Sequence, residues 1–330
     1  MREFIPRGFR VRHLRFPARQ CILTGTPDEV VMEPDRKRLR TQEFGTGPDR
    51  VMLTLDREDY SAVYPGMVRF ILAVTSGRET RAVFRTNTYE YSPLIPLAAE
   101  TSAVRRADTL EAQLRKDPAG TFRDLAEREP NVPAPEPAGT ALPQADIVII
   151  QGSPRPDGNC AILAAWVADA ARAAGSTVRV IWPHDMDIHH CIGCYQCYNI
   201  GTCVFEDDMR EIIAAIRGAS VLAICSPVYT NTVPGPLKLL IDRMQEYHAE
   251  RLLKQKRTGQ KGIILAVAGR RGVDNFACVT SVLAAFLENI GIRPADRILV
   301  DRTDSLKDIR TLPGLEERVK ETVTRMLAMG

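Results

Sequence analysis

The sequence predicts a protein of class α/β, in which a doubly wound parallel sheet follows a smaller, mostly β domain. Three observations support this prediction. The chain has 330 residues, which is enough for two domains. A proline-rich stretch at residues 130–144 separates two regions of different pattern. After this stretch, short apolar runs alternate with amphipathic segments, as is typical of strands buried between two layers of helices.

The first 129 residues form the predicted N-terminal domain, which is mostly β with some helix (α+β). Strand-like runs occur at residues 51–55, 67–74 and 80–86. The last two runs flank Ser76-Gly77, a dipeptide that suits a hairpin turn. Residues 104–129 predict a helix that breaks at Asp117-Pro118, because proline cannot continue a helix.

No catalytic group of residues stands out in this domain, where Cys21 and His13 are isolated. The sequence therefore does not predict its role. The stretch 130–144 cannot pack a core, so we predict a semi-rigid linker there. The second domain then covers residues 145–330.

Composition argues against several classes of partner. Apolar residues make up 45% of the chain and charged residues 26%, and the net charge is +3. This charge is too small to indicate nucleic acid or a membrane surface as the partner. The first twenty residues are rich in arginine and lack an apolar core, so they do not resemble a secretory leader. No apolar run reaches membrane-spanning length, and we expect a cytoplasmic protein.

The second domain shows five strand-and-helix units. The predicted strands are 147–150, 178–182, 221–225, 263–267 and 298–300. The predicted helices are 160–174, 208–217, 236–250, 275–289 and 315–329. In a doubly wound sheet of this kind, the ligand binds at the carboxyl ends of the strands.

The loop after the first of these strands predicts a phosphate site. It reads Gly-Ser-Pro-Arg-Pro-Asp-Gly-Asn-Cys over residues 152–160 and leads into a helix. Backbone N–H groups and the helix dipole favour an anion at such a position. The side chains of Ser153, Arg155 and Asn159 can add a hydroxyl, a positive charge and an amide. The loop lacks the Rossmann and P-loop patterns, and the alternative interpretation is an ordinary turn with a helix cap.

Two further loops follow the third and fourth strands. Residues 226–234 read Ser-Pro-Val-Tyr-Thr-Asn-Thr-Val-Pro, and residues 268–272 read Ala-Gly-Arg-Arg-Gly. A proline-fixed backbone beside an aromatic ring suits a planar heterocycle. The residues predicted to line this site are Pro227, Val228, Tyr229, Thr230, Asn231, Ala268, Gly269 and Gly272. The alternative interpretation is a turn at the end of a strand, with a tyrosine at the edge of the core and an ordinary glycine-rich turn.

Four of the eight cysteines fall within thirteen residues, as Cys191, Cys194, Cys197 and Cys203. In a reducing compartment such crowding indicates metal or cluster ligation rather than disulfides. The thiolates can converge only in a curled loop, and Gly193 and Gly201 allow one. Four soft ligands favour a single iron–sulfur cluster. Zinc and a redox-active thiol pair are the alternatives that we weigh against it.

These motifs carry a resemblance. The loop at 152–159 looks like the phosphate loop of the NADPH-dependent FMN reductases, and 227–229 resembles their Pro-Val-Tyr loop. The resemblance implies that Ser153, Arg155, Gly158, Asn159 and Cys160 bind the FMN phosphate, although Cys160 replaces the usual hydroxyl residue.

With the cysteine motif and Asp207-Asp208-Met209, residues 145–330 look like the iron–sulfur flavoprotein family. That resemblance implies a flavodoxin-like sheet of order 2-1-3-4-5, with FMN and a [4Fe–4S] cluster as cofactors. It also implies a homodimer or homotetramer, and a ferredoxin-like carrier as electron donor.

The function expected is electron transfer between a one-electron carrier and a two-electron acceptor, with cofactors in place of a side-chain nucleophile. One alternative is an NAD(P)H-dependent reductase of flavin or quinone without a cluster. Another is a redox-responsive binding protein whose N-terminal domain docks a partner.

Overall fold

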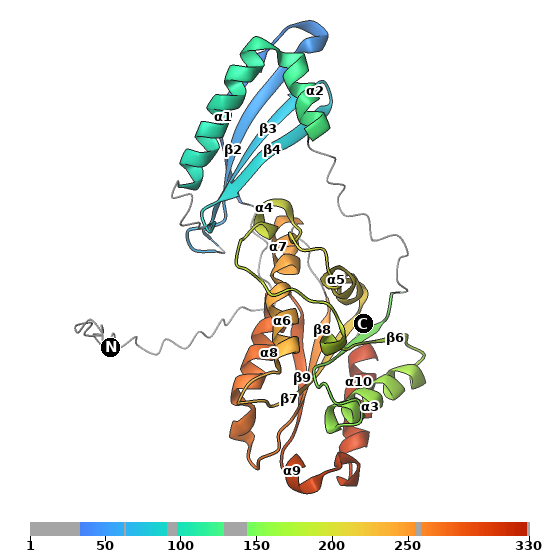
Figure 1. Ribbon diagram of the computed structural model, residues 1–330. Helices are drawn as coiled ribbons and strands as arrows, with labels where there is room; N and C mark the ends of the chain where they lie inside the picture. Colours follow the sequence, from blue (N-terminus) through green and yellow to red (C-terminus); the bar gives the residue numbers. More distant parts are fainter. Residues whose placement is uncertain (1–33, 63, 91–97, 129–143, 255–258, 329–330) are drawn as a thin grey trace, which may run out of the picture. The chain divides into compact units, whose positions relative to one another are not determined.

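Residues 35–128 form a meander of four antiparallel strands with two helices (Figure 1). The strands run in the order β1-β2-β3-β4, and are β1 Asp35–Phe44, β2 Val51–Asp59, β3 Val68–Ser76 and β4 Glu79–Asn87. The helices α1 Ala99–Lys116 and α2 Pro118–Arg128 break at the predicted Asp117-Pro118. A core of strand and helix side chains, including Leu53, Leu72 and Leu110, lies between these helices and the sheet.

The sequence prediction missed strand β1. Nine of its ten residues are exposed or only partly buried, and Phe44 alone is buried. The strand is held by backbone pairing with β2 at the edge of the sheet. A mostly charged edge strand has no apolar alternation by which it could be recognised.

The structure is a computed structural model, and it describes residues 34–62, 64–90, 98–128, 144–254 and 259–328. Pro34–Gly330 form one compact unit. The arginine-rich start, His13 and Cys21 lie outside the described residues, as does the predicted linker except for Gln144. None of the described helices is long and apolar enough to cross a membrane.

The C-terminal part is a five-stranded parallel sheet, and it confirms the predicted flavodoxin-like class. Its order is β6-β5-β7-β8-β9, which is 2-1-3-4-5 in chain order. The strands are β5 Ile147–Gln151, β6 Val178–Ile181, β7 Val221–Pro227, β8 Lys261–Val267 and β9 Arg293–Val300.

Helices cover both faces of this sheet (Figure 1). Alternate residues of β5 face opposite layers: Val148 and Ile150 belong to one core, Ile147 and Ile149 to the other. The second core is covered by α3 Asn159–Ala173 and α10 Leu315–Ala328. The first is covered by α5 Met209–Gly218, α6 Gly235–Arg243, α7 Gln245–Lys254 and α8 Ala277–Asn289. The helix expected at 236–250 is thus two helices that meet at Met244.

Because all five strands are parallel, their carboxyl ends share one edge of the sheet. The segments that leave this edge are 152–158 after β5, 228–234 after β7 and 268–272 after β8. The segment after β6 carries the cysteine motif and includes the one-turn helix α4 Cys197–Ile200. The segment after β9 carries the one-turn helix α9 Thr303–Leu306.

Candidate cofactor site

The loop between β5 and α3 is held close to the sheet. The N–H of Gly152 donates to the carbonyl of Cys225 at 2.8 Å. A Cβ at Gly152 would lie 2.6 Å from the Leu237 side chain and 3.1 Å from the carbonyl oxygen of Cys225, so a larger residue would displace Leu237. Ser153 is buried, and its hydroxyl accepts a hydrogen bond from the N–H of Arg155 at 3.2 Å. These contacts fix the turn that leads into α3.

The N-terminus of α3 has no side-chain cap. Its N-cap residue is Gly158, and no side chain accepts a hydrogen bond from the first turn. The first-turn N–H groups of a helix otherwise need an acceptor, and an anion is a favourable one. Arg155 is exposed beside this turn. The local structure therefore has the features of an anion site.

Asn159 makes contacts that the sequence did not predict. Its side-chain amide donates to the carbonyl of Lys307 at 3.1 Å and accepts from the N–H of Ile309 at 3.1 Å. The side chain thus ties the segment after β9 to the start of α3. Cys160 is 2% exposed and lies in the core, and burial raises the pKa of its thiol. What either residue can offer to a phosphate at the helix terminus is its backbone N–H.

A cavity of 370 Å³ lies between the second and third predicted loops. Its lining residues come from the ends of β7 and β8 and from two later segments: Val228, Thr230, Asn231, Ala268, Gly269, Arg270, Asn275 and Asp304. Five of these were predicted from the sequence; Arg270, Asn275 and Asp304 were not. All three follow the carboxyl ends of β8 or β9, so the rule that places ligands at this edge could have identified them.

The second loop is a tight turn with an aromatic residue at its start. The backbones of Tyr229 and Thr232 exchange two hydrogen bonds of 2.9 Å. Thr230 and Asn231 both have positive φ, 45° and 64°, a backbone conformation that non-glycine residues rarely adopt. The Tyr229 side chain is one of the few large hydrophobic groups on the described surface. Backbone outliers such as Thr230 and Asn231 are common at ligand sites.

The third loop is joined to the segment after β9. The N–H groups of Arg302 and Thr303 donate to the carbonyls of Arg270 and Ala268 at 3.1 and 3.0 Å. A Cβ at Gly269 would lie 2.3 Å from a carboxylate oxygen of Asp304. The glycine therefore makes room for this carboxylate at the wall of the cavity.

The cysteine segment is curled, as predicted. Gly193, Tyr195 and Gly201 have φ of 65°, 56° and 77°. Gly201 ends helix α4 by donating its N–H to the carbonyl of Cys197 at 2.9 Å. Both glycines named in the sequence analysis thus have the left-handed backbone that favours glycine.

The thiol of Cys197 lies near enough to the other three thiols of the motif to interact with their charges. Burial, followed by the charges of Cys203, Cys194 and Cys191, raises the pKa of the Cys197 thiol to about 12. Cys191 is exposed, and the other three are partly exposed. Among the residues that the structure describes, no three Cys, His, Asp or Glu side chains are arranged as a metal site. The donor set itself, four soft sulfur ligands on one segment, fits an iron–sulfur cluster.

A buried ion pair holds the ends of this segment. The Arg243 guanidinium donates two hydrogen bonds to Asp207, one of them 3.1 Å long, and a third to the carbonyl of His189 at 2.9 Å. Asp207 also accepts from the N–H groups of His189 and Met209, at 2.9 and 3.2 Å. The chain before and after the four cysteines is thereby fixed to α6.

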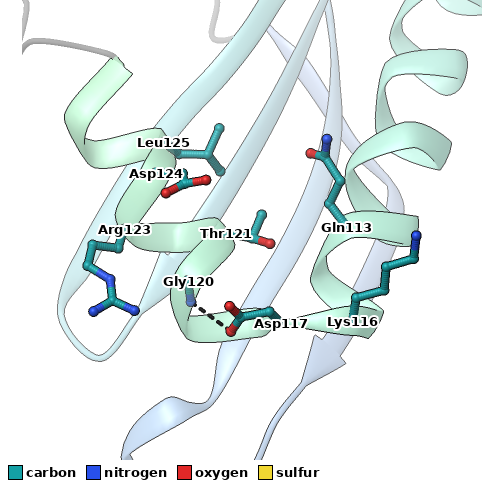
Figure 2. A pocket seen from close by; sticks show the side chains of 8 residues that line it. All are labelled: Gln113, Lys116, Asp117, Gly120, Thr121, Arg123, Asp124 and Leu125. Atoms are coloured by element: carbon teal, nitrogen blue, oxygen red, sulfur yellow. Dashed lines mark hydrogen bonds between the residues drawn. The ribbon is translucent and has the colours of Figure 1, made fainter.

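A second cavity, of 510 Å³, lies at the junction of α1 and α2. Figure 2 shows Asp117 at this junction, where its carboxylate accepts from the N–H of Gly120 at 2.9 Å. Lys116 and Arg123 lie on opposite sides of the junction. The Asp117 carboxylate thus accepts a hydrogen bond from the first turn of α2. The charged side chains of Lys116 and Arg123 do not point toward a common position. This cavity is therefore not the candidate site.

Comparison with known proteins tests the resemblance that the sequence of the C-terminal part suggested. Residues 145–293 match the family described as NADPH-dependent FMN reductase. This part of the chain is therefore similar to that family. The match confirms the sequence resemblance and the class of a flavin-dependent oxidoreductase for this domain.

Relatives of the C-terminal part include two archaeal proteins. An iron-sulfur flavoprotein of Methanocaldococcus jannaschii is 33% identical over 126 residues, which are 38% of this chain and 64% of that protein. An iron-sulfur flavoprotein of Methanosarcina thermophila is 31% identical over 125 residues, 37% of this chain and 62% of that protein. The chain thus spans less than two thirds of the length of either relative. Among solved structures, the apo form of an NADH:FMN oxidoreductase is 18% identical, with a TM-score of 0.42, over 56% of this chain and 90% of that one.

Proposed function

We propose that this protein transfers electrons between a one-electron carrier of the ferredoxin type and a two-electron acceptor, through a [4Fe–4S] cluster and FMN. One observation carries the proposal. The four-cysteine segment leaves the same edge of the parallel sheet as the uncapped helix α3 and the 370 Å³ cavity. A soft-ligand motif and a flavin-type site therefore share the edge at which such sheets bind their ligands.

The residues around α3 and the cavity fit FMN. The phosphate would be held by backbone N–H groups from Gly158 to Cys160, with Ser153 and Arg155 as further partners. The isoalloxazine ring would lie in the cavity between residues 227–231 and 268–272. FMN supplies electron transfer in one-electron or two-electron steps. The protein binds and orients the ring, with Tyr229 and Val228 on one side and the backbone of Ala268, Gly269 and Gly272 on the other.

The four cysteines would hold the cluster, which supplies one-electron transfer. The Asp207–Arg243 pair and helix α4 keep their loop in a curled shape. The names of the archaeal relatives support this choice. We further propose a cytoplasmic homodimer or homotetramer, which is what the resemblance to the iron–sulfur flavoproteins implies.

A second candidate is an NAD(P)H-dependent FMN or quinone reductase without a cluster. The description of the matched family favours it.

Purification without oxygen, followed by a visible spectrum and assays of iron and sulfide, separates the two candidates. Flavin bands on a broad absorption, with about four irons per chain and reduction by ferredoxin, support the cluster. Flavin without iron, reduced by NADPH alone, contradicts it and supports the second candidate. Cys194→Ser should lose the iron, whereas Cys278→Ser, an exposed cysteine outside the motif, should retain it.

A further inference from the structure

The turn that carries Cys197 is in contact with the N-terminal domain. Helix α4 lies against the end of strand β4. At this end Asn87 is fully buried. Its side-chain amide donates to the Asn199 side chain at 2.9 Å and to the carbonyl of Tyr195 at 3.4 Å. Its oxygen accepts from the N–H groups of Tyr89 and Glu90 at 2.9 and 3.2 Å. The Asn87 side chain thus forms hydrogen bonds both within its own turn and with the cysteine segment.

The carboxylate of Glu90 makes a second link to the same turn. It accepts hydrogen bonds from the side chain of Asn199, and from that of Gln196 at 3.3 Å. Thr86 orients it from the other side, with its hydroxyl 2.8 Å away. Asn199 is 2% exposed. A buried amide that loses its partners is costly, so these bonds constrain where α4 can lie.

Aromatic side chains surround this polar link. Tyr60 and Met67 of the N-terminal domain form a buried cluster with Tyr198 and Ala249. Tyr64, Tyr89, Tyr195 and Cys197 pack against that cluster. Of the four motif cysteines, Cys197 is the one that packs against this cluster, which residues of both domains form.

The backbone of this turn needs such support. Tyr195 has a φ of 56°, a conformation that bulky residues adopt only where the surroundings impose it. Its carbonyl accepts from Asn87, and its ring packs edge-on against Tyr89, with ring centroids 5.4 Å apart. Both contacts come from the N-terminal domain.

We infer that the N-terminal domain acts as a clamp on the cysteine segment, in which Asn87 and Glu90 are positioning residues. They hold the turn 195–199 so that Cys197 keeps its place relative to the other three thiols, and the tyrosines cover part of its side chain. The clamp residues precede the matched family region, residues 145–293, so they are a feature of this chain. The purpose of the clamp, retention of a cluster, rests on the proposed function, whereas the contacts between the two segments are independent of it.

The test is the alkylation rate of each cysteine in the full-length, reduced, metal-free protein, followed with iodoacetamide and peptide mass spectrometry. Cys191 is exposed and serves as the internal reference. Asn87→Ala should raise the rate at Cys197 relative to Cys191 by about fivefold for each hydrogen bond lost. Gln113→Ala, an exposed amide on α1 of the same domain, should leave the ratio unchanged.

A double variant shows whether the effect passes through the contact. If Asn87 and Asn199 act on each other, the Asn87→Ala and Asn199→Ala changes together should raise the rate little more than either alone. Circular dichroism establishes that each variant is folded. An unchanged Cys197 to Cys191 ratio in folded Asn87→Ala overturns the clamp.

Measurement of iron release distinguishes failure of the clamp from failure of the proposed function. In the loaded protein, Asn87→Ala should lose iron to a chelator faster than the wild type while it retains its flavin. If the wild type carries no iron, the cluster proposal fails, and the alkylation ratio still decides whether the clamp exists.

Discussion

The carboxylate of Asp207 and the guanidinium of Arg243 form a two-point ion pair in which neither side chain is exposed beyond 1%. The guanidinium also lies over the ring of Phe205, 5.2 Å from its centroid. Removal of one partner from a buried pair leaves an uncompensated charge. The pair therefore fixes the cysteine segment, and removal of either side chain should destabilise the fold.

We predict that Asp207→Asn lowers the free energy of unfolding by about 3 kcal/mol, because Arg243 stays buried without its counter-charge. The measurement is denaturant unfolding followed by circular dichroism. Asp242→Asn is the matched control, since the Lys238–Asp242 pair is exposed and should contribute about 0.5 kcal/mol or less. Equal losses in the two variants would contradict a special role for the buried pair.

The same pair predicts how stability depends on pH. Burial opposes ionisation of Asp207, but the hydrogen bonds and charge of Arg243 outweigh it and hold the pKa of this carboxyl below its usual value. A group whose pKa is depressed on folding stabilises the protein above its unfolded pKa, about 4. This stability is lost as the pH falls through the folded pKa. Acid unfolding should therefore be less steep below about pH 4 in Asp207→Asn than in the wild type. Parallel curves would show that other carboxylates dominate.

If the FMN phosphate binds at the N-terminus of α3, loss of the Arg155 charge should weaken binding of FMN but not of a flavin without phosphate. Arg155→Ala should weaken FMN binding by about 10- to 100-fold, because a charge-assisted hydrogen bond is removed. The measurement is quenching of flavin fluorescence at low and high salt. Binding of riboflavin, which has no phosphate, should be the same in both proteins. Arg172→Ala, at the other end of α3, is the control. A similar loss for riboflavin would mean that Arg155 does not act on the phosphate.

Apolar periodicity predicted the five parallel strands and most helices because burial imposes that periodicity on the sequence. The strand order came from the family resemblance, and the break at Asp117-Pro118 from the proline. Strand β1 was missed because backbone pairing at an edge needs no apolar side chains. The contact of Asn159 with Ile309 joins residues 150 positions apart. No local pattern records such a contact, so the sequence predicted a phosphate donor at Asn159 and did not predict the tether.

That tether predicts a specific loss. Asn159→Ala removes one donor and one acceptor bond to the segment after β9, and should lower the free energy of unfolding by about 1 to 2 kcal/mol. Asn159→Asp retains the acceptor for Ile309 and should lose less. If both variants keep full stability but bind FMN poorly, the side chain serves the phosphate and not the tether. Denaturant unfolding and flavin titration on the same samples separate the two outcomes.

The carboxylate of Asp304 at the wall of the cavity predicts an effect on the potential of bound flavin. Reduction of a flavin adds electrons, and a nearby negative charge disfavours them. Asp304→Asn should therefore raise the midpoint potential of bound FMN by roughly 20 mV, if the interaction is about 1 kcal/mol in a solvated site. Asp274→Asn is the control, because Asp274 is an acidic residue on the neighbouring 3₁₀ turn Val273–Phe276 that does not line the cavity. A spectroscopic redox titration gives both values. Equal potentials in the two variants would place the ring away from Asp304, and with it away from Gly269, whose missing side chain makes room for this carboxylate.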